Sequence, residues 1–499
     1  MRVLLTLALL LPQGKPPDDV DKARDALAKA VTALDRFGAD RACATLVKLN
    51  DDRVPEIFIG AYRAGLLQIA ELEKERLKVV KELEKAEVVR DKEGKVLKGD
   101  PNRWELLKRD HDAWAAKIDL LHGVLPHILS QISKLTTLKA IVIALNNTPE
   151  WYPRACCAEA LGKIDQPEAV AALVARVSRE IEPGVRVAIA DALAPRVATH
   201  EEAKKAMLPW LEGGTWASRM AAAQALTNSR DKRLIPSLIK MLRGASARMK
   251  YEIDLCLKNL TGGVTRRGEF SAWESWWEKN ENEVLAGTYV PTPADKDEGP
   301  GVTTFYGIPL HSTKVVFIID VSLSMKDPTT WKPEITDNVD KIDGERSIDV
   351  ARYELRKIVR KLPEGAQFDV IGMYGRLALL SEKWVSAINN ERERAIKFIN
   401  ALEIKTGTDV HAALMRALDF SGGNWNTPPR EDSIDTIFML SDGMPSVGSV
   451  PRSEIADRIL DAARFKRIAI TTVALAAPKD GRELLKRISD GTGGLHVLR

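Results

Sequence analysis

The chain has 499 residues, enough for several domains with large hydrophobic cores. Its 74 basic and 70 acidic residues leave a net charge of only +4, without a concentrated basic patch, which argues against a nucleic-acid-binding protein. Four cysteines are too few for a disulfide framework. Three of them, Cys156, Cys157 and Cys256, occupy apolar helical positions, where buried thiols are common.

Residues 1–19 have the composition of a short secretory signal followed by a polar leader. Arg2 precedes an apolar run that ends at Leu11, and Pro12 and Gly14 then break the pattern. The run is too short to cross a bilayer, and no clean small-residue cleavage site follows it. We predict an exported protein without a membrane span. A cytoplasmic protein that starts with an ordinary helix or strand is the alternative.

Residues 20–150 are rich in Ala, Leu, Glu and Lys at helical spacing. A long amphipathic helix is predicted over residues 62–86, and a second helix begins at Asn102. The Gly- and Pro-containing segment 91–101 separates the two helices, so we predict an antiparallel αα-hairpin.

An internal repeat occupies residues 151–286. Arg154, Arg186 and Arg219 each begin a similar eight-residue helical segment, and a looser copy begins at Lys250. A second apolar helix follows each of the first three segments, which is typical of an α-solenoid. The pattern resembles short HEAT-type repeats. Its concave face could bind a second protein partner, or the array could be a rigid spacer.

Two further segments before residue 312 can be interpreted. Aromatic residues at helical spacing over 270–277 predict an aromatic seal at the end of the repeat array. Residues 287–311 contain several prolines and acids, and we predict a linker there.

Residues 312–499 alternate strands and helices, which predicts an α/β doubly wound domain with a mostly parallel sheet. The strands are expected near 315–319, 368–374, 377–380, 436–440, 468–474 and 496–498. The helices are expected near 347–362, 391–402, 410–418, 454–465 and 482–489. The predicted fold is therefore multidomain, with an all-α N-terminal part followed by this α/β domain.

Polar side chains follow the first apolar strand of this domain. Asp320, Ser322 and Ser324 alternate directly after a β-branched run. Ligands bind beyond the carboxyl ends of the strands in open α/β sheets, so these three oxygens could face one point. Downstream, Thr408 precedes a predicted helix, and Asp442 follows a second apolar strand.

Together these three pieces resemble the metal-ion-dependent adhesion site of von Willebrand factor type A domains. The resemblance covers about residues 312–499. It implies that the hydroxyls of Ser322 and Ser324 bind a metal directly, that Thr408 and Asp442 bind it directly or through water, and that Asp320 acts mostly indirectly. The family usually has Gly-Gly-Thr where this chain has Thr406-Gly-Thr, so Thr406 is a secondary candidate.

The ligand chemistry favours a hard cation. Oxygen ligands with few carboxylates suit Mg²⁺, with Mn²⁺ or Ca²⁺ as alternatives. Such an under-neutralised ion would attract an Asp or Glu carboxylate from a protein partner. The alternative is that these residues only cap a helix and shape turns.

The polar segment 326–345 departs from the family pattern, in which a helix follows the first motif closely. It contains the acids Glu334, Asp337, Asp340, Asp343 and Glu345. One of these carboxylates could close the metal site as a lid, or the segment could be a plain surface loop.

No enzyme is expected. The chain has no Gly-x-Ser-x-Gly elbow and no Gly-x-x-x-x-Gly-Lys-[Ser/Thr] phosphate loop. The leading interpretation is a metal-dependent adhesion or scaffold protein. The alternatives are a metal-dependent hydrolase, a subunit of an ATP-driven metal-insertion or remodelling complex with a separate motor, and a structural protein whose site is vestigial.

Overall fold

The computed structural model describes residues 18–86, 89–90, 96–296, 304–329, 331–332, 342–419, 425–448 and 450–499. It divides into two compact units, Met1–Pro149 and Glu150–Arg499. The predicted signal segment falls almost entirely in residues 1–17, outside the described residues. Within the described ranges, no helix combines the length and apolar character that a membrane span needs.

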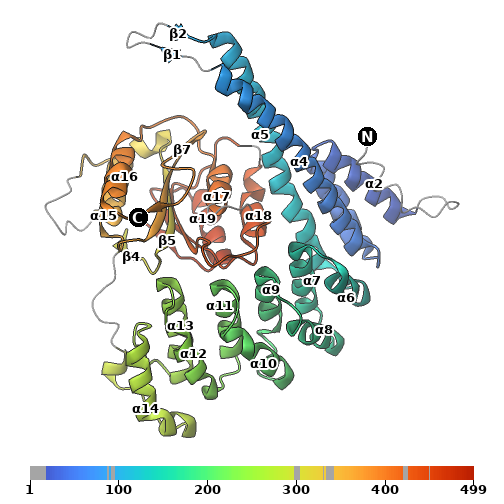
Figure 1. Ribbon diagram of the computed structural model, residues 1–499, viewed down its shortest axis with the longest axis vertical. Helices are drawn as coiled ribbons and strands as arrows, with labels where there is room; N and C mark the ends of the chain where they lie inside the picture. The colour runs from blue at the N-terminus through green and yellow to red at the C-terminus, as the bar shows by residue number, and fades with distance from the viewer. Residues whose placement is uncertain are drawn as a thin grey trace. The chain divides into compact units, whose positions relative to one another are not determined.

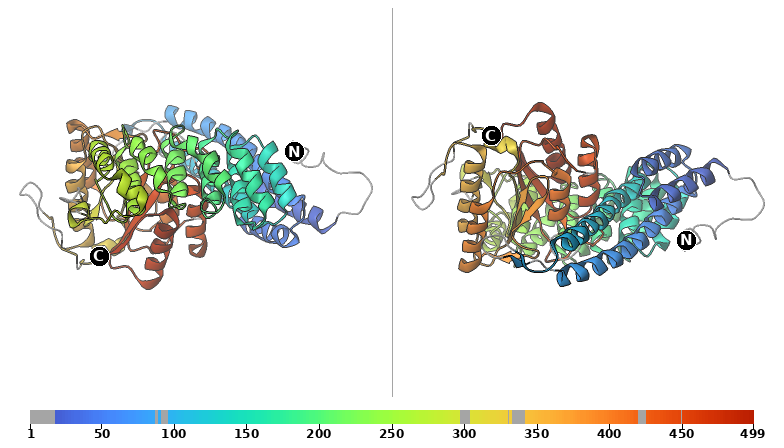
Figure 2. Two further views of the ribbon diagram at one scale, coloured as in Figure 1. Left: turned by 90° about the horizontal axis from the view of Figure 1, so that it is seen from below. Right: turned by 90° about the horizontal axis from the view of Figure 1, so that it is seen from above.

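The first unit is helical and contains the predicted αα-hairpin. The long helices α4 and α5 pack along each other, as the view from above shows (Figure 2, right). Helix α4 begins at Val54, earlier than predicted, because Pro55 starts it and Phe58 and Ile59 are buried on its first turns. The elements are α2 (Asp19–Thr32), α3 (Arg36–Leu49), α4 (Val54–Lys85), β1 (Val89–Arg90), β2 (Val96–Lys98), α5 (Pro101–Ser130), η1 (Gln131–Lys134) and α6 (Leu138–Asn147).

The second unit begins with an array of paired helices. Helices α7, α9, α11 and α13, which carry the repeated segments, pack successively against one another (Figure 1). Small residues allow this approach, since a Cβ on Gly162 would meet the Cβ of Ala192 at 2.6 Å. The array is thus an observed feature, and its assignment to the HEAT type stays a prediction. Its elements are α7 (Trp151–Lys163), α8 (Pro167–Val177), α9 (Pro183–Leu193), α10 (Glu201–Met207), η2 (Leu208–Leu211), α11 (Trp216–Thr227), η3 (Lys232–Leu234), α12 (Ile235–Met241), α13 (Ala247–Thr261) and α14 (Phe270–Ala286).

The aromatic helix α14 closes the array. The ring of Trp273 is fully buried and its Nε1 donates a 2.6 Å hydrogen bond to Asp254 on α13. This confirms the predicted aromatic seal. The described residues of segment 287–311 include buried side chains, and the linker assigned to this segment stays a prediction. Asp295, in the short helix η4 (Pro293–Lys296), is buried and pairs with Arg266, and Phe305 is buried in the core of the following domain. Pro293 begins η4, and Pro309 lies in the short strand β4.

The C-terminal domain is a seven-stranded, mostly parallel sheet with strand order β11-β10-β9-β5-β6-β7, and β8 also pairs with β6. Strands β7 and β8 run antiparallel to β6. The elements are β3 (Thr304–Phe305), β4 (Ile308–Pro309), β5 (Lys314–Asp320), η5 (Leu323–Lys326), α15 (Ser347–Lys361), β6 (Gln367–Met373), β7 (Leu377–Leu379), β8 (Val385–Ser386), α16 (Asn389–Ala401), α17 (Val410–Leu418), β9 (Thr436–Ser441), α18 (Arg452–Ala463), β10 (Ala469–Ala474), α19 (Lys479–Thr492) and β11 (His496–Leu498).

Helices cover both faces of this sheet. Helices α15 and α16 lie on one face, and α17, α18 and α19 lie on the other (Figure 1). Alternate residues of β5 divide between the faces, as strand geometry requires, so Val315, Phe317 and Ile319 join the core beneath α15. The predicted strands and helices are all present. The pairing of β8 was missed because two residues carry too little periodicity to detect.

The helical array packs on the sheet domain beside the segments that precede β9 and β10. In Figure 1 the array lies below the sheet domain. Tyr152 of α7 lies edge-on against Trp425 and Phe465, with ring centroids 5.1 and 5.7 Å away, and its hydroxyl donates to the Asp461 carbonyl. Arg464 pairs with Glu159 at 2.9 Å nearby. Trp151 Nε1 also donates to the Asn426 carbonyl at 2.6 Å, so aromatic, hydrogen-bond and ionic contacts all join the array to the sheet domain.

Candidate metal centre

Asp320 ends β5 and is fully buried. One carboxylate oxygen, Oδ1, accepts the Ser322 N–H at 2.8 Å, and the other, Oδ2, accepts the Ser441 hydroxyl at 2.6 Å. Burial raises the pKa of Asp320 to about 6; hydrogen bonds from these two serines oppose the shift, and the nearby Asp442 charge adds to it. Both oxygens of Asp320 are engaged in holding the loop, in keeping with an indirect role at a metal.

Ser322 and Ser324 flank Leu323 at the start of the short helix η5. Their hydroxyl oxygens lie 3.0 Å apart. Ser322 is buried and Ser324 is exposed, so the pair points from the sheet edge toward solvent. Neighbouring oxygens around an octahedral ion at about 2.1 Å are separated by roughly 3 Å. The spacing of these hydroxyls therefore fits two adjacent ligands of Mg²⁺.

Thr408 lies in the loop before α17, which hydrogen bonds tie to both neighbouring loops. The N–H of Lys405 donates to the Val321 carbonyl at 2.8 Å, and the Thr408 N–H donates to the Ser446 hydroxyl at 3.0 Å. Gly407 has a φ of +84°, and a Cβ there would meet the Cα of Gly375 at 2.8 Å, so only glycine fits. The structure thus brings the Thr408 loop beside the two serines.

Thr406, the secondary candidate, is exposed and contributes its carbonyl to a 3.0 Å hydrogen bond from the Gly375 N–H. Its backbone thereby supports the loop next to the metal candidates. Nothing in these contacts directs its hydroxyl to the same point as Ser322.

Asp442 follows β9 and is half-buried. Its Oδ1 accepts the Met444 N–H at 3.0 Å. Gly443 adopts a φ of +72°, and a Cβ there would meet the Gly481 carbonyl at 2.5 Å, so this turn packs tightly against the start of α19. Among the described residues, neither Asp442 nor Asp320 has an ion-pair partner. Two acids close together without a basic partner favour a bound cation.

The candidate ligands can bind a metal, although most of them are neutral hydroxyls instead of His, Cys, Asp or Glu side chains. Within the described part of the chain, no three His, Cys, Asp or Glu side chains form a group that could hold a metal. The donor set instead combines hydroxyls from two loops with an unpaired carboxylate from a third. Neutral oxygen donors with few charges match hard divalent cations that retain water.

The polar segment 326–345 is described only in part. Pro328 and Arg346 form a bridge that joins its two ends. Asp343 pairs with Arg356 of α15 at 3.1 Å, which engages its carboxylate away from the metal loops. Glu334, Asp337 and Asp340 lie outside the described residues and Glu345 is exposed, so the lid stays a prediction for these four.

Sequence reasoning missed Ser441, which bonds Asp320 and also accepts the Gly443 N–H at 2.9 Å. The available signal was a hydroxyl at the last position of an otherwise apolar strand, directly before Asp442. A buried hydroxyl there requires a partner, and a neighbouring strand end is the natural one.

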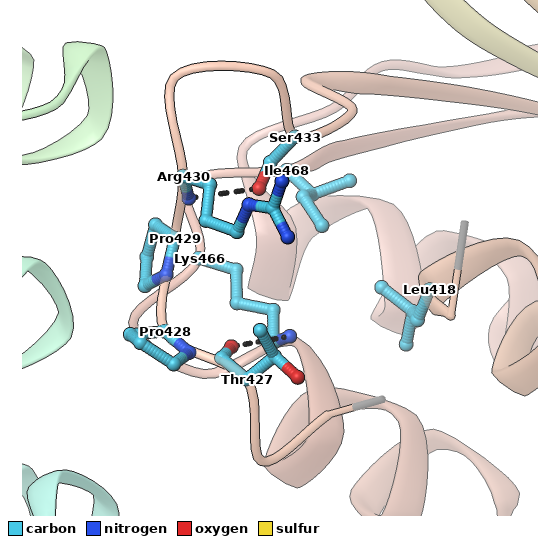
Figure 3. A pocket seen from close by; sticks show the side chains of 8 residues that line it. All are labelled: Leu418, Thr427, Pro428, Pro429, Arg430, Ser433, Lys466 and Ile468. Atoms are coloured by element: carbon cyan, nitrogen blue, oxygen red, sulfur yellow. Dashed lines mark hydrogen bonds between the residues drawn. The ribbon is translucent and has the colours of Figure 1, made fainter. Parts of the chain in front are cut away.

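A small pocket of about 10 Å³ lies at the opposite end of the strands, beneath the segment that precedes β9 (Figure 3). The Nζ of Lys466 donates to the Thr427 carbonyl at 3.0 Å, and the Arg430 N–H donates to the Ser433 hydroxyl at 2.8 Å. Burial lowers the pKa of Lys466 to about 8. A cavity of this size holds about one water, so it is not a ligand site.

The fold and the loops define a class: a doubly wound α/β domain whose strand ends carry a hydroxyl-rich, cation-competent site. Residues 338–497 match the family model for the von Willebrand factor type A domain. The C-terminal domain of this chain is a von Willebrand factor type A domain, a protein-interaction module. The matched range contains Thr408 and Asp442 and begins after Asp320, Ser322 and Ser324.

The chain is similar to known proteins over about a third of its length and spans less than a fifth of the curated relatives that it matches. Inter-alpha-trypsin inhibitor heavy chain H2 of Mus musculus is 24% identical over 182 residues, which are 36% of this chain and 17% of that protein. A von Willebrand factor type A structure from Catenulispora acidiphila is 18% identical and covers 37% of this chain and 38% of its own, with a TM-score of 0.28. A structure of proximal thread matrix protein 1 from the mussel byssus has zinc in its metal-ion-dependent adhesion site (MIDAS) motif. It is 13% identical, covers 37% of this chain and 43% of its own, and has a TM-score of 0.27.

Proposed function

We propose that this protein is a divalent-metal-dependent binding protein, an adhesion or scaffold component without enzymatic activity. Ser322, Ser324, Thr408 and Asp442 would hold Mg²⁺, and Asp320 would orient the first loop from behind. When bound, the ion supplies a Lewis-acidic position for an Asp or Glu carboxylate of a protein partner. The chain's own residues fix the loops and leave this position exposed on the sheet edge.

The observation that carries the proposal is the 3.0 Å separation of the Ser322 and Ser324 hydroxyl oxygens beside two acids that lack a basic partner among the described residues. Capping and turn formation would explain each residue alone. They would not explain why hydrogen bonds join the loops of Ser322, Thr408 and Asp442 at one edge of the sheet, beside two acids without a basic partner among the described residues. The same donor set also accommodates Mn²⁺, and Ca²⁺ fits less well because it prefers more carboxylates.

Two features support a binding protein over the hydrolase alternative. His411, the histidine nearest in sequence to the metal loops, is buried in α17. Asp409 uses its carboxylate to accept the Ala412 N–H at 2.9 Å as the N-cap of that helix. A general base must reach a solvent-exposed water or substrate, whereas His411 is buried and Asp409 caps the helix.

Calorimetric titration of the full chain with Mg²⁺, Mn²⁺ and Ca²⁺ tests the metal. We expect one site per chain that favours Mg²⁺ or Mn²⁺, and Asp442→Ala or Ser322→Ala should abolish the binding heat. Ser386→Ala, on the exposed edge of β8, is the matched control. Equal binding by the wild type and Ser322→Ala would contradict the proposal. A pull-down with and without chelator, alongside assays for ester, peptide and phosphoester turnover, tests the partner and the absence of catalysis.

Two further parts of the proposal are independent of the metal. Export is tested by sequencing the N-terminus of the protein recovered from each cell fraction. A second partner on the helical array would have to use surfaces other than those of α7, α9 and α11 that already contact the sheet domain. Binding of a partner by residues 150–286 that persists in chelator would support it.

A further inference from the structure

An open pocket of about 430 Å³ lies directly beside the candidate metal centre. Two of its lining residues adjoin the metal candidates in sequence: Leu323 separates the two serines, and Thr406 lies two positions before Thr408. The remaining wall comes from Tyr374 and Arg376 at the β6–β7 turn and from Ile404 and Lys405. The pocket and the metal centre therefore share the same loops.

Backbone hydrogen bonds hold the pocket in shape. The Gly375 N–H donates to the Thr406 carbonyl at 3.0 Å, and the Asp409 N–H donates to the Tyr374 carbonyl at 3.1 Å. A Cβ on Gly375 would meet the Thr406 carbonyl oxygen at 2.9 Å, so the two walls are in close contact. A pocket that is already ordered before binding loses little conformational entropy when it is filled.

Its base is apolar and exposed. Leu323 is 48% exposed although it lies between the two metal-candidate serines. Ile404 and the ring of Tyr374 are half-buried beside it. A leucine held open to solvent at a candidate binding edge, next to other apolar groups, is the type of surface that a partner covers.

Its rim is basic. Among the described residues, Arg376 has no ion-pair partner and is exposed. Lys405 also faces the pocket, but it is already paired with Glu403 at 2.9 Å. Arg376 is therefore the lining cation that is available to a ligand.

We propose that this pocket binds the residues next to the metal-bound acid. The partner is then a protein segment with two acids and an apolar residue. One carboxylate goes to the metal, the apolar side chain covers Leu323, Ile404 and Tyr374, and the second carboxylate pairs with Arg376. This assignment rests on the proposed function and adds its specificity. The complementarity of charge and polarity selects an acidic, apolar-containing segment over a simple acidic tail.

Fluorescent, end-blocked peptides containing Asp-Leu-Glu test the pocket by anisotropy with the full chain in Mg²⁺ or Mn²⁺. The comparison peptides contain Asp-Leu-Gln, Asp-Ser-Glu, Asn-Leu-Glu and the longer-spaced Asp-Leu-Gly-Glu. We expect the better of the two doubly acidic spacings to bind about five- to tenfold more tightly than Asp-Leu-Gln. Arg376→Gln should remove this difference and leave the metal titration unchanged. Arg109→Gln on the exposed face of α5 is the control.

Leu323→Ser provides a second test of the pocket. It should weaken binding of Asp-Leu-Glu severalfold and leave Asp-Ser-Glu unchanged. Methyl NMR of the wild type gives an independent readout, because the Leu323 resonance, assigned by its loss in Leu323→Ser, should shift on addition of Asp-Leu-Glu.

The outcomes separate the two proposals. If no peptide shows chelator-sensitive binding and no metal titrates, the proposed function fails and the pocket assignment falls with it. If metal binds and Asn-Leu-Glu is rejected, but both doubly acidic peptides bind no better than Asp-Leu-Gln and Arg376→Gln changes nothing, the pocket assignment alone is overturned.

Discussion

The hydroxyl of Ser441 donates a 2.6 Å hydrogen bond to the carboxylate of Asp320 and so joins the ends of β9 and β5 at the metal edge. Ser441→Ala would leave Asp320 Oδ2 without this donor inside a buried site. We expect the Mg²⁺ affinity to fall by about 10- to 100-fold with the fold retained, as for other groups that orient metal-site residues. Calorimetric titration measures the loss, with Ser386→Ala as the control. Unchanged affinity would show that Asp320 needs no orientation by β9.

Metal removal should change stability in a site-specific way. A ligand that binds only the folded state stabilises it by about 2.7 kcal/mol at one hundred times its dissociation constant. We expect Mg²⁺ to raise the Tm of the wild type, and chelator to reverse the rise. Ser322→Ala should show no Mg²⁺-dependent shift. An equal shift in both proteins would mean that the ion acts elsewhere.

Stability should depend on pH through Asp369, which is fully buried in β6 and whose Oδ2 accepts no hydrogen bond within the described residues. Burial raises the pKa of Asp369 to about 8, against the opposing effects of the Val370 N–H and Arg416. An unfolded aspartate titrates near pH 4, so the folded state holds an extra proton between about pH 4 and 8. This contribution to stability is present at low pH and is lost as the pH rises.

Asp369→Asn removes that dependence, since the amide stays neutral. We expect the variant to gain stability relative to the wild type between pH 5 and pH 8, by at most about 1.4 kcal/mol per pH unit. Urea denaturation at both pH values measures the difference. Parallel pH profiles for the two proteins would rule out titration of this carboxyl.

The contact between the helical array and the sheet domain should depend on the ring of Tyr152. Removing a buried aromatic ring costs about 3–5 kcal/mol, whereas losing one hydrogen bond costs about 1 kcal/mol. We expect Tyr152→Ala to lower the Tm strongly and Tyr152→Phe to lower it slightly, both with unchanged Mg²⁺ affinity. Phe37→Ala is the control, because that ring is 55% exposed. Equal effects of Tyr152→Ala and Phe37→Ala would exclude a structural role for the contact.

Much of the fold was predictable because the apolar periods are strong. The apolar runs before Asp320 and Asp442 each form a central strand of the sheet. The repeated eight-residue segments each lie in a helix that packs against the next one. The packing of residues 287–296 and 304–311 was not predictable. Their prolines resemble those of a linker, and the burial of Asp295 and Phe305 depends on tertiary contacts.

The candidate site was likewise predictable only in part. Asp320, Ser322, Ser324, Thr408 and Asp442 could be named from their places after strands and before a helix, and their metal binding stays a prediction. Arg376 could not, because its relevance depends on a turn between β6 and β7 that folds over the Thr406 loop. Sequence order carries no signal for a residue that reaches a site only through such a contact.

The α7 contact lies where β9 and β10 begin, whereas the candidate ligands lie where β5 and β9 end. A load applied by an attached partner would therefore run lengthwise along the strands. Between parallel strands the hydrogen bonds are evenly spaced and slanted, so several of them would share such a load.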